Sequence, residues 1–192
     1  MNTITLRDMA SIIAKAETRP EEKVFNQLKG LAGRNILSAL PDFYGKKGAL
    51  LFRPKEIYRA RMLLAALDNG FAADALATFD AQLRSESREV FANGTHVERS
   101  LEKAVAALGD ENQAWQFQVG QQRINGKLAY SGHWTINGRH SEATHDWLSQ
   151  PPEGYEFDYA GSLESVVTLM FTNICRPIFD EVARRENTES PE

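Results

Sequence analysis

The sequence predicts an α+β fold, in which helices come first, a small antiparallel β-meander follows and helices flank it. Apolar residues recur at three- and four-residue intervals up to about residue 90, which is the period of amphipathic helices. Beyond residue 115, short alternating segments are separated by Asn-Gly pairs, which are typical of hairpin turns. A long apolar segment near the end completes the pattern as a final helix.

The first helix is expected to begin after Thr5, a residue type that caps helices well, with Asp8 in the first turn. Thr18 is expected to cap a second helix, which starts at Glu21 and is short because glycines lie near its end. Charged and amide side chains surround its apolar stripe.

The spacing of the apolar residues changes after the second helix. Residues 36–40 and 49–52 are short apolar runs, and we interpret them as a hairpin whose long tip carries Lys46 and Lys47. The next helix is led by a proline and is expected to end at Gly70.

A further helix is expected over about residues 72–90, and Asn93-Gly94 marks a break. We place a domain boundary there, which gives domains at 1–92 and 93–192. The second domain is expected to hold a short helix and then the meander.

Trp115 begins the first strand of the meander, and the segment 127–136 between two Asn-Gly turns is the second. Residues 155–159 are a candidate extension. A last long helix is predicted over residues 162–183, with a disordered tail from about 186.

Charge is distributed unevenly along the chain. The 192 residues carry 22 Lys+Arg and 26 Asp+Glu, for a net charge of −4. Residues 1–61 hold 12 basic and 6 acidic residues, a net of +6, so the remainder has a net of −10. A basic part joined to an acidic remainder favours contact with a polyanion through one end of the chain. Nucleic acid is therefore the first hypothesis for a partner.

Other features bear on the compartment. The single cysteine, Cys175, cannot form an internal disulfide, and its place beside Ile174 predicts a buried thiol. The chain starts without the layout of a secretion signal and has no run near about 18 apolar residues. A cytoplasmic protein without membrane contact is expected.

Residues 51–71 read Leu-Phe-Arg-Pro-Lys-Glu-Ile-Tyr-Arg-Ala-Arg-Met-Leu-Leu-Ala-Ala-Leu-Asp-Asn-Gly-Phe. This segment, with the order of helices and hairpin before it, resembles the DNA-binding domain of MerR-type transcription regulators, over about residues 4–80. The family's Arg-x-Tyr-Tyr run after the recognition helix is not found. The resemblance therefore extends to the wider winged group, which includes phage excisionases and terminase small subunits. It implies a winged helix-turn-helix fold and double-stranded DNA as the partner.

Basic and amide side chains of the second helix suit base edges and phosphates, and those of the hairpin and its base suit phosphates. The residues expected to contact DNA are Arg19, Lys23, Asn26, Gln27, Lys29, Arg34, Lys46, Lys47, Arg53, Lys55 and Arg59.

The acidic second domain shows no catalytic signature. His140 and His145 do not match a known metal-ligand spacing, and there is no nucleophile set and no phosphate loop. We expect no enzyme activity, no metal and no cofactor. Four aromatic residues are compatible with either a ligand pocket or the core of a small sheet: Trp115, Trp134, Trp147 and Tyr155.

The last predicted helix is apolar on more than one stripe, so it is either sandwiched in a core or shared with a second copy. Two-fold DNA sites favour a homodimer. The expected contact residues are Val167, Met170, Phe171, Ile174, Ile178 and Phe179.

The leading hypothesis is a homodimeric, sequence-specific transcriptional regulator. The alternatives are a phage or mobile-element DNA-binding factor, and a protein-interaction or small-molecule-binding module.

Overall fold

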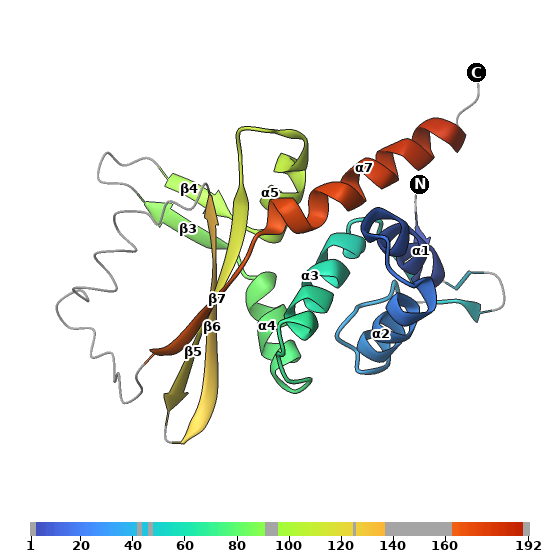
Figure 1. Cartoon of the computed structure of the whole chain (residues 1–192). Coiled ribbons are helices and arrows are strands. Elements are labelled where there is room, and N and C mark those ends of the chain that lie inside the picture. The colour runs from blue at the N-terminus through green and yellow to red at the C-terminus, as the bar shows by residue number, and fades with distance from the viewer. Residues whose placement is uncertain are drawn as a thin grey trace. The chain divides into compact units, whose positions relative to one another are not determined.

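The computed structural model describes residues 3–41, 44, 45, 48–90, 96–124, 126–136 and 163–189 (Figure 1). Helices and antiparallel sheets make up this part of the chain, so the predicted α+β class is confirmed. Residue contacts divide the chain into two compact units. We call Met1–Ala77 with Asn173–Glu192 the helical unit, and Thr78–Thr172 the sheet unit.

The units do not follow the order of the sequence. Residues from Asn173 onward, assigned above to a second domain, group with the beginning of the chain. The expected boundary at residues 92 and 93 stays a prediction, because residues 91–95 lie outside the described residues.

The helical unit begins with β1 (Ile4–Thr5) and α1 (Leu6–Glu17). Thr5 caps α1 as predicted. Its hydroxyl accepts a hydrogen bond from the amide of Asp8 at 3.2 Å, and its own amide donates to the Asp8 carboxylate at 3.1 Å. This reciprocal pair satisfies donors that the first helical turn otherwise leaves open.

The second helix, α2 (Glu21–Gly33), differs from the expectation at both ends. Thr18 does not cap it, because Thr18 has a φ of 54° and closes α1 in the left-handed conformation. Glycines do not shorten α2, which continues for 13 residues. Its buried stripe, which includes Val24 and Leu28, provides the packing that outweighs the low helix propensity of glycine.

The predicted hairpin is largely replaced by another pairing. β2 (Leu51–Phe52) is antiparallel to β1, not to residues 36–40, which form no strand. Among the described residues, the amide of Leu40 donates to the carbonyl of Leu51 at 2.8 Å, and a single bridge joins Tyr44 to Leu50, beside which the amide of Gly45 donates to the carbonyl of Ala49 at 2.8 Å. Lys46 and Lys47 lie outside the described residues.

The helix after the proline forms as predicted. It is α3 (Glu56–Asp68), and Gly70 follows it with a φ of 82°. The next helix, α4 (Ala75–Leu83), is shorter than predicted, because Ser87–Val90 form β3 and pair with β4 (His96–Arg99).

The sheet unit continues with α5 (Leu101–Ala106) and the 3₁₀ turn η2 (Ala107–Gly109). Then come β5 (Trp115–Ile124) and β6 (Lys127–Ile136), a hairpin closed by Gly126 with a φ of 76°. The first two strands of the predicted meander are therefore confirmed.

The third strand is β7 (Leu163–Leu169), which pairs with β5 to give the order β6-β5-β7. The prediction of one helix over residues 162–183 is thus wrong in its first half. β5 has room for a second partner, and Val166 and Val167 are β-branched residues that suit a strand. The helix proper is α7 (Phe171–Glu189), which includes part of the predicted tail.

Candidate nucleic-acid interface

Six of the residues predicted to contact DNA have exposed side chains. None of the six forms an ion pair with another residue of the described part of the chain. They are Lys23, Asn26, Lys29, Arg34, Arg53 and Lys55.

These residues come from two neighbouring places in the helical unit. Lys23, Asn26 and Lys29 lie on α2, which Arg34 directly follows, and Arg53 and Lys55 lie between β2 and α3. The turn after α2 is held to α3, because a buried arginine of α3 donates to the carbonyl oxygen of Ile36. The two groups of cations therefore lie on segments that are connected to each other within the helical unit.

Arg19 is occupied within the fold. Its guanidinium donates to the carboxylates of Glu17 and Asp68 at 3.3 and 3.2 Å, and to the amide oxygen of Gln27 at 3.2 Å. Glu17 also accepts from Arg61. Arg19 and Gln27 thus connect α1, α2 and α3, which reduces their availability to DNA.

Arg59 was expected to hold a phosphate, and its position does not fit that role. Its side chain is only 3% exposed, lies 2.6 Å from the Glu56 carboxylate and also donates to Ile36. A buried, neutralised guanidinium is a structural group, so we do not include Arg59 in the candidate interface.

The beginning of α2 is acidic rather than basic. Glu21 and Glu22 both pair with Arg7, whose guanidinium lies 3.9 Å from the centre of the Phe25 ring. The hydrogen bond to Glu22 raises the pKa of Arg7. The face of α2 that remains free to attract an anion therefore runs from Lys23 toward its C-terminal end.

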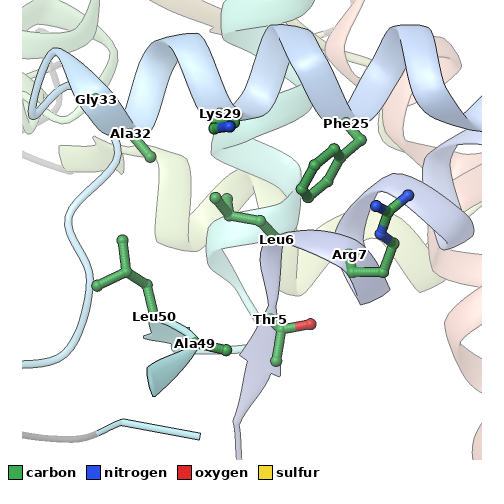
Figure 2. Close-up of a pocket in the computed structure, with 9 residues that line it drawn as sticks. All are labelled: Thr5, Leu6, Arg7, Phe25, Lys29, Ala32, Gly33, Ala49 and Leu50. Atoms are coloured by element: carbon green, nitrogen blue, oxygen red, sulfur yellow. The ribbon is translucent and has the colours of Figure 1, made fainter. Parts of the chain in front are cut away.

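A pocket of about 470 Å³ lies beside this face (Figure 2). Phe25 points down from α2, and Leu6 and Leu50 point up toward it, so that the walls are mainly apolar. Lys29, Ala32 and Gly33 complete the α2 side. The sequence did not predict this pocket, because its walls come from separate segments that meet through the packing of α1 on α2 and the pairing of β1 with β2.

The aromatic residues of the sheet unit form a core. Trp115 and Trp134 are buried, and Trp134 stacks edge-on against Phe171 with ring centres 5.3 Å apart. These two tryptophans therefore belong to the core of the sheet rather than to a ligand pocket, the alternative that the sequence left open. Trp147 and Tyr155 lie outside the described residues.

No group of three or more His, Cys, Asp or Glu residues that could hold a metal occurs among the described residues. His133 lies on β6, whereas His140 and His145 fall outside the described part.

Most of the residues expected at a dimer contact already pack against other residues of the same chain. Phe171 and Ile178 are fully buried, and Val167 pairs with Val119 in the sheet. Ile174 and Phe179 are half-buried, and Met170 is 36% exposed. The expected two-sided helix is therefore replaced by a strand and a helix whose main stripe already has intrachain partners.

The two units differ in charge. The helical unit has 15 Lys/Arg and 13 Asp/Glu residues, a net of +2, and the sheet unit has 7 and 13, a net of −6. Asp68 and Asp74, together with residues 173–192, which hold 5 acidic and 3 basic residues, reduce the positive charge of the helical unit from the +6 of residues 1–61. Among the described residues, no helix combines the length and apolar character needed to cross a membrane.

No protein-family model matches the chain, and no curated protein matches it.

Proposed function

We propose that the chain is a transcriptional regulator that binds double-stranded DNA through α2 and the segment leading into α3, in the manner of a winged helix-turn-helix protein. The supporting observation is the contrast between cations in one unit. Arg7, Arg19 and Arg59 are paired with carboxylates, whereas Lys23, Lys29, Arg34, Arg53 and Lys55 are exposed and form no ion pair with a described residue. Cations left free in this way suit phosphate oxygens.

In this proposal, Asn26 reads a base edge, because an amide at an exposed helix position can donate to and accept from adenine. The lysines and arginines set the position of α2 on the duplex without reading sequence. The acidic sheet unit limits binding to bulk DNA, since like charges repel. A homodimer would suit DNA sites with two-fold symmetry. This general symmetry argument is the only support for a homodimer.

The test is a salt titration of binding to a labelled random-sequence duplex, followed by fluorescence anisotropy. Each lost phosphate contact should reduce the slope of log K against log salt by about 0.9. We expect that reduction for Lys29→Ala and for Lys55→Ala. Lys127→Ala, which removes an exposed cation of the sheet unit, is the matched control and should leave the slope unchanged.

Absence of binding by the unmodified protein at about 50 mM salt would contradict the proposal, since the electrostatic contribution is large there. The same holds if the three variants and the unmodified protein give one common slope.

A further inference from the structure

The pocket beside α2 has the size and the walls of a small-molecule site. Its volume of about 470 Å³ lies within the range of roughly 300–1,000 Å³ usual for such sites. Apolar surface comes from Leu6 of α1, from Phe25 and Ala32 of α2, and from Leu50, which directly precedes β2 (Figure 2). Because few polar atoms line it, a sugar or another neutral polar ligand would lose hydrogen bonds on entering.

The two cations at the pocket are not equivalent. Arg7 is neutralised by Glu21 and Glu22 and covers the Phe25 ring. Lys29 is exposed and forms no ion pair with a described residue. An anionic group is therefore attracted to the Lys29 side, whereas the two glutamates disfavour a second negative charge near Arg7.

We propose that this pocket binds a small amphipathic monoanion, whose apolar body lies between Phe25, Leu6 and Leu50 and whose anionic group pairs with Lys29. The bound molecule removes Lys29 from contact with phosphate and so opposes DNA binding. This second part rests on the proposed function; the binding itself does not.

Gly33 makes the pocket testable by filling. It lines the pocket, and a Cβ atom placed on it meets no atom within 4 Å. Gly33→Leu therefore adds a large side chain at the wall of the pocket without a clash at Cβ. Gly30 is equally open and lies on the same helix, but it does not line the pocket. Gly30→Leu is the matched control.

The probe is anilinonaphthalene sulfonate, which has a fused apolar ring system and one anionic group and fluoresces strongly in apolar surroundings. We expect saturable binding to the full chain. Lys29→Met should weaken it about tenfold, since one charge-assisted contact is lost, and Gly33→Leu should weaken it at least as much. Lys23→Met and Gly30→Leu should bind as the unmodified protein does. Equal affinity in all five proteins, or no saturable binding, would overturn the proposal.

A second measurement tests the effect on DNA. Added probe should release labelled duplex from the unmodified protein and should release much less from Gly33→Leu. Release at the same probe concentration from both proteins would overturn the proposed opposition. If the unmodified protein binds the probe but no duplex, the DNA-binding function fails and the pocket stands.

Discussion

The thiol of Cys175 lies 4.0 Å from the main-chain oxygen of Tyr58, although 117 positions separate the two residues. The contact joins α7 to α3 inside the helical unit (Figure 1). Burial raises the pKa of Cys175, and burial together with the nearby thiol raises that of Tyr58 to about 12. The end of the chain is thus part of the core that supports the candidate interface.

Cys175 should resist thiol reagents in the folded protein. It is fully buried and its raised pKa keeps the nucleophilic thiolate scarce at neutral pH. With dithionitrobenzoate, we expect reaction at the rate of unfolding, and rapid reaction after urea is added. Prompt stoichiometric reaction under native conditions would contradict the buried position.

A fragment of residues 1–92 should be much less stable than the full chain. It lacks Cys175 and Ile178, which are fully buried, and loss of one large aliphatic core side chain alone costs about 2–5 kcal/mol. We expect a lower thermal midpoint, or no cooperative transition, by circular dichroism.

The control for that fragment joins residues 173–189 to residues 1–77 through a flexible Gly/Ser linker. This chain restores the helical unit and should recover cooperative unfolding. If the 1–92 fragment melted at the temperature of the full chain, α7 would not contribute to the core as described.

Local signals in the sequence were sufficient for several elements. Thr5 with Asp8, and the glycines at 70 and 126, act within a few residues, and the structure agrees with each of them. Thr18 is the exception: it could cap the following helix or end the preceding one, and it takes the second role with a φ of 54°, which is uncommon for a β-branched residue. The two alternatives cannot be distinguished from the local sequence.

Sequence-based prediction was less accurate for segments whose partner in the fold lies far away along the chain. Leu163–Leu169 has apolar pairs that suit a helix, but β5 is available as a strand partner more than forty positions earlier. The candidate site shows the same limit. Arg19 pairs with Asp68, whereas Lys29 forms no ion pair with a described residue. This difference depends on tertiary contacts, so residue type and place in the predicted helix-turn-helix indicated both as DNA contacts.

Two glycine-to-alanine changes should have opposite effects on stability. Gly30→Ala places its Cβ in open space on α2, so it should stabilise the protein by about 0.5–1 kcal/mol through helix propensity. Gly132→Ala would bring its Cβ to 2.6 Å from the Phe117 ring and 2.8 Å from the side-chain oxygen of Gln82, which should destabilise by about 1–3 kcal/mol.

Urea unfolding midpoints measure both glycine effects. The explanation from packing space is contradicted if Gly132→Ala is neutral, or if Gly30→Ala lowers the midpoint.

Glu181 should make stability depend on acid pH. It is only 6% exposed and lies 3.5 Å from Lys15 of α1 and 2.8 Å from Arg185 of α7. Burial raises its pKa, but hydrogen bonds from Arg184 and Arg185 outweigh this effect and lower the pKa from 4.5 to about 2. Because the folded pKa lies below the unfolded one, the stabilisation is complete above about pH 5 and is lost as the pH falls toward 2.

Glu181→Gln should therefore destabilise the protein at pH 7 by about 1–2 kcal/mol, since it removes charge-assisted hydrogen bonds. The difference from the unmodified protein should narrow steadily between pH 5 and the folded-state pKa of about 2. Urea unfolding at a series of pH values measures it. Glu102→Gln, at an exposed position of α5, is the control and should show little difference at any pH. A Glu181→Gln effect that is constant from neutral to acid pH would mean that the carboxylate charge is not what stabilises the contact between α1 and α7.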